Sequence, residues 1–322
     1  MFTRLVTGAC SRPQAAAFAS ATVLLLTGAA VAVAQPSTLP EITVIDRAQN
    51  DDRFDLSDRV LFMGADPTEL LGAAPGGAVN NNGPLSLQAQ YRGMFGPRVN
   101  VAIDGLGIVS GGPNWMDPPL HYLPPGLLDT MVLQRGIAPV TAGSSVGGAA
   151  QATAVRGEFT GDDTFSLQGR FSAGAASAND STDLTGLIAV ANDRHRLHVL
   201  GAIEEGDDAR SARGDLRGTS YERDTYGVGY GLRLTGDDYI AIDYLRTQTG
   251  NSGNPVLPLD IEFFNTNRTT LSTSLSPAGV AVEARVRIID VDHRMNNFEL
   301  RDAPDFSQLT LPPFQGDDRR FV

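Results

Sequence analysis

Hydrophobic and polar residues alternate at every second position over long stretches of the second half of the chain. The alternation is clearest at residues 165–173, 226–234 and 280–288. Side chains of a β-strand point to opposite faces in turn, so this period gives each strand one apolar face and one polar face. Weaker versions of the pattern predict further strands near 184–192, 195–205, 238–249 and 267–276. We therefore expect about seven or eight antiparallel strands.

The segments between these strands favour a transmembrane β-barrel over a soluble β-sandwich, whose strands show a similar alternation. The turn between Arg233 and Tyr239 is short, whereas the segments after residues 205 and 250 are longer and polar. Strands of about ten residues joined by short turns and long loops are typical of outer-membrane barrels. No apolar run after residue 34 reaches the roughly 18–20 residues that a membrane helix needs. Residues 157–322 are accordingly interpreted as strands that cross a membrane.

The region 64–156 has a different pattern, which predicts a small α+β domain. Asp66 is placed to cap a helix, because Pro67 follows at the first helical position and Glu69 stands three residues on. Further along, alternating apolar residues lead up to the pair Asp104–Gly105. An Asp-Gly pair between apolar residues favours a tight hairpin turn, so we assign this pair a geometric role.

Residues 1–34 have the pattern of a secretory signal peptide. Arg4 and Arg12 precede an apolar run, and Ala32–Ala34 forms a small-x-small cleavage site. An N-terminal membrane anchor is the alternative interpretation. Removal of this segment takes away Cys10, the only cysteine, and two of the arginines, so the net charge moves from −12 to −14. The mature chain is then expected to have no disulfide and no thiolate metal site.

The charge of the chain argues against nucleic-acid binding. All 25 basic residues are arginine, and 37 acidic residues outnumber them. Proteins that bind nucleic acid carry a basic patch or stripe, and no basic cluster is present in this acidic sequence. We expect no nucleic-acid partner.

Several short motifs lie close together between residues 91 and 149. They are Tyr91–Gly96, Val99–Gly105, Gly111–Pro119, Arg135–Pro139 and Gly147–Ala149. Together they resemble the plug domain of TonB-dependent outer-membrane receptors. The element Gly-Pro-Asn-x-Met-Asp-Pro-Pro at 112–119 is similar to that of the copper-receptor branch.

This resemblance implies a small plug domain followed by antiparallel transmembrane β-barrel strands. It also implies the outer membrane of a Gram-negative bacterium, contact with outer-membrane lipid, a metal ion or metal chelate as cargo, and no prosthetic group. Copper is the expected cargo. The family closes a barrel of about 22 strands around the plug. Since seven or eight strands are expected here, the sequence is interpreted as a fragment of a receptor or a truncated gene product.

The family also implies a TonB-type energy-transducing partner. In the family, a short extended segment near the mature N-terminus docks this partner by strand addition, in which backbone hydrogen bonds carry the affinity. The N-terminal extension, residues 35–63, contains one β-prone run. It consists of Glu41, Ile42, Thr43, Val44 and Ile45. We expect the partner to bind there, although any exposed five-residue strand has the same appearance.

Three residues carry the prediction of a metal site. His293 and Met295 are two apart on a predicted strand, so both point to the face that also holds Arg285 and Arg287. This polar face is the one that faces the inside of a barrel. In the copper branch, this His-x-Met pairs with a Cys-x-x-x-Met element on the plug, and Met116 matches its methionine. Copper, especially Cu(I), prefers soft sulfur ligands and accepts imidazole.

The chain departs from the copper pattern at one position. Gly112 stands where the family has its cysteine, which removes the strongest ligand and weakens the case for tight copper binding. The alternative for His293 is pairing with a carboxylate such as Asp292, and the alternative for Met116 is packing as a hydrophobe in its loop. Met94 and His121 are possible auxiliary ligands of the same cavity. His195 and His198 fall on opposite faces of a strand, which is poor ligand geometry.

Two other functions compete with copper import. A receptor for a siderophore or another metal chelate would bind its larger ligand with aromatic and arginine side chains. A secreted β-rich enzyme or adhesin is the remaining alternative, but the sequence has no His-Glu-x-x-His and no paired cysteines. We therefore expect no catalytic activity.

Overall fold

The structure, a computed structural model, describes residues 53–55, 64–110, 115–137, 143 and 145–302. The chain divides into two compact units, residues 1–48 and 49–322, and all described residues belong to the second. The first unit, which contains the expected signal peptide and the run Glu41–Ile45, lies outside the described residues.

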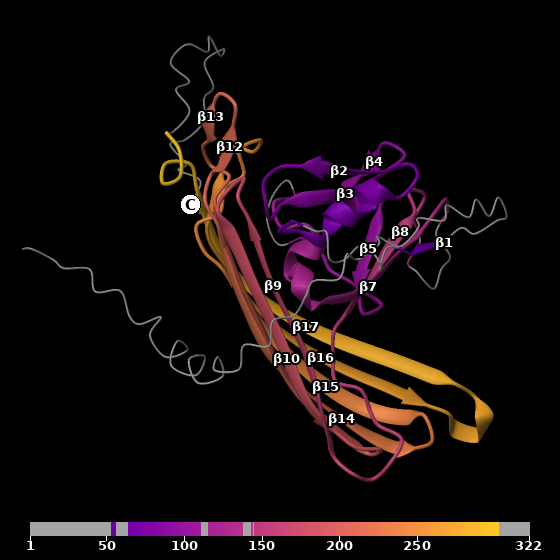
Figure 1. The fold of residues 1–322 in the computed structure, drawn as a ribbon. Helices are drawn as coiled ribbons and strands as arrows, with labels where there is room; N and C mark the ends of the chain where they lie inside the picture. The colour runs from indigo at the N-terminus through magenta and orange to yellow at the C-terminus, as the bar shows by residue number, and fades with distance from the viewer. Residues whose placement is uncertain (1–52, 56–63, 111–114, 138–142, 144, 303–322) are drawn as a thin grey trace, which may run out of the picture. The chain divides into compact units, whose positions relative to one another are not determined.

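Seven long strands form one antiparallel sheet, in which every strand pairs with its neighbours in the order β17-β16-β15-β14-β11-β10-β9 (Figure 1). They are β9 Ser166–Ala176, β10 Ser181–Ala191, β11 His195–Gly206, β14 Tyr221–Thr235, β15 Asp238–Thr249, β16 Asp260–Leu275 and β17 Val282–Asn296. Each predicted strand is present, which confirms the interpretation of the alternating pattern. In the part of the chain that the structure describes, the sheet is open, with β9 and β17 at its edges.

The connections follow the predicted division into short and long segments. Only two residues separate β14 from β15, and Gly236 there has a φ of 57°, in the left-handed region that glycine adopts without strain. The segment after residue 206 is longer and carries its own hairpin, β12 Ala209–Ser211 with β13 Gly214–Leu216.

The two faces of the sheet differ in burial as the alternation predicts. On β11, Arg196, His198 and Glu204 are buried, whereas Leu197 and Val199 between them are about half exposed. β10, β14, β15 and β16 show a similar alternation over much of their length, whereas β9 and the first part of β17, at the edges of the sheet, are exposed on both faces. An apolar face that is exposed along all the strands is what a barrel wall presents to lipid.

The strands of residues 53–55 and 64–156 form two smaller sheets, and we refer to this part of the chain as the small domain. The five-stranded sheet has the order β1-β7-β8-β5-β6, and β5 pairs parallel with β8. Its strands are β1 Arg53–Asp55, β5 Asn100–Ile103, β6 Leu106–Gly107, β7 Leu128–Gln134 and β8 Ala149–Ala154. The three-stranded sheet contains β2 Gly77–Asn81, β3 Leu87–Tyr91 and β4 Met94–Phe95.

The helical part of this domain is smaller than an α+β reading suggests. Every helix of the described residues is a short 3₁₀ segment, each with a proline in its first two positions: η2 Pro67–Ala73, η3 Gly96–Arg98, η5 Pro119–Tyr122, η6 Pro125–Leu127 and, between β16 and β17, η8 Pro277–Gly279. Proline fixes φ for a first turn, but single turns have too few hydrogen bonds to grow into α-helices. None of these helices is long and apolar enough to cross a membrane.

The predicted cap at Asp66 is present, with one difference. The Asp66 carboxylate accepts a hydrogen bond from the backbone N–H of Thr68 at 2.8 Å, as an N-cap does. The Glu69 carboxylate accepts from the N–H of Gly64 instead of reaching back to the cap residue. Glu69 therefore binds the backbone two residues before the cap.

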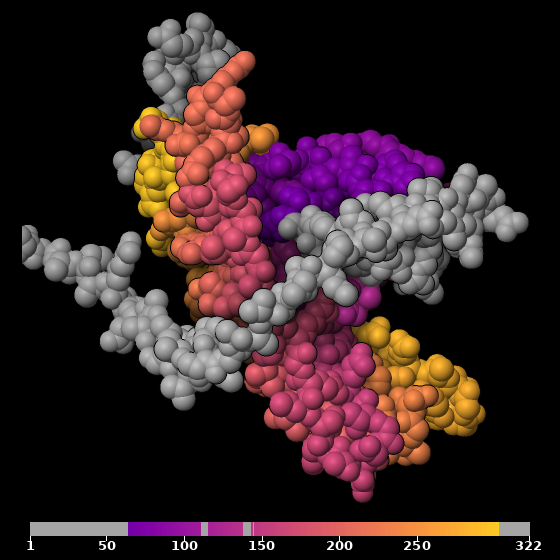
Figure 2. Space-filling view, viewed as in Figure 1, coloured from indigo at the N-terminus to yellow at the C-terminus, as the bar shows by residue number. Residues whose placement is uncertain are grey.

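The hairpin at Asp104–Gly105 is confirmed. Ile103 pairs with Leu106, and the two turn residues have φ values of 52° and 75°, as a tight hairpin turn requires. One hydrophobic core then joins the domain to the sheet, because it contains residues of both, such as Leu120 and Met116 with Phe264 and Met295. Figure 2 shows the domain, in indigo, lying directly against the strands.

Candidate functional site

Met116 lies in the core where the small domain meets the sheet. Its side chain is buried, and its carbonyl accepts a hydrogen bond from the Ser86 hydroxyl at 2.5 Å. Trp115 before it has a φ of 56°, so the chain turns sharply into this position. Met116 is thus held at a fixed place in the core by its own backbone.

His293 and Met295 lie on the inner face of β17, as predicted. Burial alternates along the second half of this strand, and Met295 is buried in the core that also contains Met116. His293 is opposite Phe264 on β16, with the two ring centroids 5.4 Å apart. The pairing of the two strands shifts at Glu262, and this bulge lies beside the Ile261–Met295 pair.

A cluster of four rings, here called the ring cluster, connects His293 to the small domain. The ring of Phe264 packs edge-on against the rings of His121 and Tyr122, with centroid distances of 5.1 Å and 5.8 Å. It also packs against the His293 ring in a tilted arrangement. Phe264 and His293 belong to the sheet, and the other two rings belong to η5. Phe264 is therefore the ring through which η5 is connected to His293.

His121 is fully buried and uncharged. Its Nδ1 lies 2.9 Å from the carbonyl oxygen of Leu85, which can only accept, so Nδ1 carries the proton. Its Nε2 then accepts from the Thr249 hydroxyl at 3.3 Å. Burial, with Arg223 nearby, lowers the pKa of His121 from 6.5 to about 4.

Among the predicted ligands, the structure brings Met116 and Met295 into one core and places His293 on the adjoining ring cluster. Gly112 lies outside the described residues. Met94 packs partly buried against the same core. The described residues contain no group of three or more His, Cys, Asp or Glu side chains that could hold a metal ion.

A buried arginine, which the sequence pattern did not single out, ties the sheet to the small domain at this point. Arg223 on β14 is the bulkiest fully buried side chain of the described residues. Its Nε donates to Glu204 at 2.7 Å, and its two terminal nitrogens donate to the carbonyl oxygens of Ala65 at 2.7 Å and His121 at 3.0 Å. A buried guanidinium is tolerated only when it is paired in this way. Its inward position on a strand was predictable, but the partners were not.

The neighbouring Asp66 is also buried. Its carboxylate accepts from the N–H groups of Thr68 and Leu87, which fastens the start of η2 to β3. Burial raises the pKa of Asp66 from 3.8 to about 6, although the N–H donors and Arg223 oppose the shift.

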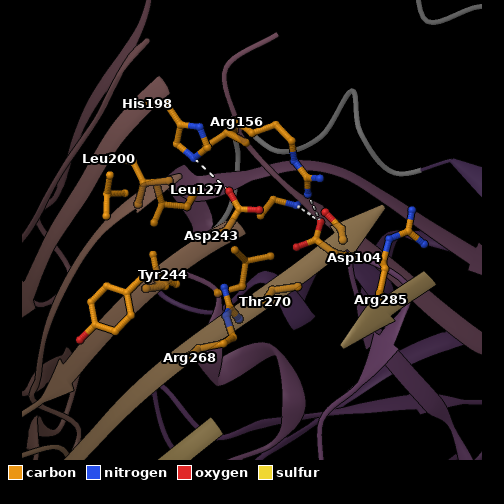
Figure 3. A pocket seen from close by; sticks show the side chains of 16 residues that line it. Asp104, Leu127, Arg156, His198, Leu200, Asp243, Tyr244, Arg268, Thr270 and Arg285 are labelled. Atoms are coloured by element: carbon orange, nitrogen blue, oxygen red, sulfur yellow. Dashed lines mark hydrogen bonds and ion pairs between the residues drawn. The ribbon is translucent and has the colours of Figure 1, made fainter. Parts of the chain in front are cut away.

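A second contact between the domain and the sheet borders a cavity of about 50 Å³ that charged and apolar side chains line together (Figure 3). The hairpin residue Asp104 pairs with Arg156 and lies 3.9 Å from Arg287. Across the cavity, His198 of β11 and Asp243 of β15 approach to 3.5 Å. The assignment of a purely geometric role to Asp104–Gly105 is thus incomplete, since the Asp104 carboxylate also anchors two arginines.

Glycine makes the His198–Asp243 contact possible. Gly229 on β14 is paired with His198 on one side and with Asp243 on the other. A Cβ at this position would overlap both side chains. His198 and His195 point to opposite faces of β11, as predicted, and His195 lies 2.8 Å from the Tyr230 hydroxyl on the exposed face.

Comparison with known proteins assigns the fold. Residues 41–150 match the family model of the TonB-dependent Receptor Plug Domain. The copper transporter OprC superposes with a TM-score of 0.70 at 23% identity, over 80% of this chain and 40% of its own. The FrpB iron transporter from Neisseria meningitidis gives 0.61 at 15% identity, over 75% and 41%. The hemophore receptor HasR from Serratia marcescens, solved with its hemophore and heme, gives 0.64 at 18% identity, over 77% and 39%.

These likenesses concern the fold, and they extend over less than half of each solved receptor. The chain spans about 40% of the length of the receptors that it matches. A comparison with curated protein sequences found no match.

Proposed function

We propose that this chain, which has the plug domain and the barrel-wall strands of a TonB-dependent receptor, works in a transporter of the Gram-negative outer membrane that imports copper. The plug closes the pore, the cargo is held by Met116 of the plug with His293 and Met295 of β17, and a TonB-type protein supplies the energy. The observation that carries the cargo assignment is the burial of two thioethers, Met116 and Met295, in one core beside His293. Two sulfurs and an imidazole suit Cu(I) better than any hard cation.

The exposed apolar face of the seven strands supports the location, since it fits lipid and would be costly in water. The fold neighbours support the class of function, because their printed names describe receptors and transporters. No chemical step is assigned to the chain.

The energy-transducing partner is proposed to bind the run Glu41, Ile42, Thr43, Val44 and Ile45. Two observations support this: the run is β-prone, and the family match begins at residue 41. An added strand would use backbone hydrogen bonds, so proline is the informative substitution. Thr43→Pro should abolish partner binding, whereas Thr43→Ser should not.

Copper binding is tested by titrating the full chain in detergent with Cu(I) under reducing conditions. We expect His293→Ala and Met295→Ala each to weaken binding at least tenfold, or about 1.4 kcal/mol. His195→Ala is the matched control, because His195 lies on the opposite face of the sheet. Equal affinity in all three variants would remove the site.

The departure at Gly112 gives a gain-of-function test. A thiolate is a softer and stronger donor for Cu(I) than a thioether, so Gly112→Cys should tighten binding. The control is Gly112→Ser, which adds a side chain of similar size without sulfur. If Gly112→Cys binds no more tightly than Gly112→Ser, residue 112 does not line the site.

Import of a metal chelate is the second candidate, because iron and heme receptors are among the fold neighbours. A large chelate would not depend on a single imidazole. The affinity of a ferric chelate for the wild type and for His293→Ala distinguishes the two cargoes. Equal affinity for the two variants would favour a metal chelate as the cargo.

A further inference from the structure

The plug is held to the sheet by three buried arginines that donate to plug carbonyl groups. Arg223 reaches Ala65 and His121, Arg268 reaches Tyr122, and Arg287 reaches Ile103 at 2.8 Å and Leu106 at 3.3 Å. Carbonyl groups on three separate plug segments are bound in this way. Arg268 and Arg287 each serve one segment, whereas Arg223 alone among the three serves two.

The two segments that Arg223 holds are far apart in sequence and differ in role. Ala65 stands at the entry of the plug, directly before the capped turn η2 and 20 residues beyond the proposed partner-binding run that ends at Ile45. His121 lies in η5, five residues beyond Met116, and its ring contacts Phe264 of the ring cluster. The Arg223 guanidinium thus binds both the segment that follows the proposed partner-binding run and the segment that follows the proposed ligand Met116.

We propose that Arg223 is a positioning residue that couples these two segments, so that loosening η5 loosens the plug entry, and the reverse. This inference rests on the proposed function for its meaning, since it gives the route by which cargo at Met116 would change the strength with which the entry is held. Arg223 itself contacts no proposed ligand atom and acts through His121.

The geometry gives the reason for the coupling. The guanidinium is planar and rigid, and its Nε is fixed by Glu204 on the neighbouring strand. Its two remaining donor groups therefore have one orientation in which both carbonyl oxygens lie within reach. Displacement of either carbonyl leaves a buried donor without a partner, which favours rotation of the guanidinium and loss of the other bond.

Coupling between two sites is reciprocal, so it is measurable without cargo. Asp66→Ala loosens the entry by removing the cap of η2. Amide hydrogen exchange, read by mass spectrometry on the full chain in detergent, then reports on the η5 amides of His121 and Leu123, which are bonded to Pro118 and Leu120. We expect Asp66→Ala to speed exchange at these amides at least fivefold.

The decisive comparison repeats Asp66→Ala in a background that lacks the arginine. Glu204→Gln with Arg223→Gln removes the charge pair together and leaves no unpaired buried carboxylate. In that background, we expect Asp66→Ala to leave η5 exchange unchanged within twofold. Arg287→Gln is the matched control, since it deletes an arginine with two carbonyl bonds to the plug, and the fivefold effect should persist there.

Two results would overturn the coupling. One is an effect of Asp66→Ala on η5 that survives in the Glu204→Gln, Arg223→Gln background. The other is an effect of Asp66→Ala in wild type that is equally large at β7 and β8, which would mean general loosening of the plug. If the chain does not bind Cu(I), copper is not the cargo, but neither exchange result changes. Failure of the proposed function and failure of the coupling are therefore distinguishable.

Discussion

The plug meets the sheet through two contacts of opposite character. The first, which we term the η5 contact, comprises the core residues Met116, Phe264 and Met295 and His121 of η5, whose carbonyl accepts from the buried Arg223. The second, the hairpin contact, comprises Asp104, Arg156, His198 and Asp243 beside a cavity of about 50 Å³, which apolar side chains such as Leu123 also line. Both contain arginine, but the charged groups of the second lie beside a cavity.

The difference teaches which part of the interface resists movement. A buried ion pair with apolar neighbours is costly to break, because a single remaining charge has no water. Charges beside a cavity large enough for a few water molecules lose less when a partner moves away, since water replaces it. We therefore expect the hairpin contact to yield before the η5 contact does.

Substitution of Arg223 should have the largest effect on stability. Arg223→Gln leaves Glu204 buried without its partner, which typically costs about 3–5 kcal/mol. Arg156→Gln, at the hairpin contact, should cost about 1 kcal/mol, because its carboxylate partner is partly exposed. Thermal unfolding of the full chain in detergent measures both. Equal losses for the two variants would contradict the contrast between the contacts.

The pH dependence of the plug comes from the η5 contact and from Asp66 beside it. The pKa of Asp66 is raised to about 6, so its contribution to stability is complete below pH 3.8 and is lost as the pH rises through 6. The pKa of His121 is lowered to about 4, so its contribution is complete above pH 6.5 and is lost as the pH falls through 4. Each shift of about two units corresponds to about 3 kcal/mol.

Because these two contributions oppose one another, they should nearly cancel between pH 4 and 6.5 in the wild type. Asp66→Asn removes one of them, so its stability relative to the wild type should fall by about 3 kcal/mol as the pH drops from 6.5 to 4. His121→Asn should show the opposite slope. Chemical denaturation across this pH range gives the slopes, and identical slopes in the two variants would exclude the assignment.

The strands and their faces followed from the sequence, but the partners of the inward polar groups did not. Alternation placed His293 and Met295 on the inner face, since the period of a strand leaves two choices for each side chain. Extended back from residues 226–234, the same alternation places Arg223 there as well. That Arg223 binds Ala65 and His121 depends on how the plug packs against the sheet over more than 100 residues of sequence, which no local pattern records.

The hairpin contact shows the same limit in another form. The glycines at positions 227, 229 and 231 were recognisable as part of a strand, but the reason for glycine at these positions was not predictable. Only the register shows that Gly229 lies between His198 and Asp243 and leaves room for them to meet. The prediction that His195 and His198 lie on opposite faces of a strand was correct because it needed strand geometry alone.

Gly229→Ala should have an intermediate effect. The added Cβ overlaps His198 and Asp243, so the side chains must separate, at a cost of about 1–3 kcal/mol. Gly201→Ala is the matched control, since a Cβ there meets only the Thr225 carbonyl at 3.4 Å and should cost less than about 0.5 kcal/mol. Thermal unfolding distinguishes them, and a neutral Gly229→Ala would mean that the His198–Asp243 contact is not held in place.

Met116→Leu should have a small effect on stability and is the most informative substitution about the cargo. Leucine has nearly the volume of methionine, so the packing of the η5 contact should weaken by less than about 1.5 kcal/mol. The thioether is lost, however, so Cu(I) affinity should fall at least tenfold, about 1.4 kcal/mol. Leu120→Met is the matched control, because it makes the opposite substitution, leucine to methionine, in the same core. It removes no proposed ligand, so Cu(I) affinity should not fall. If Met116→Leu keeps both stability and Cu(I) affinity, Met116 is a packing residue, and the tight η5 contact serves to seal the plug without binding metal.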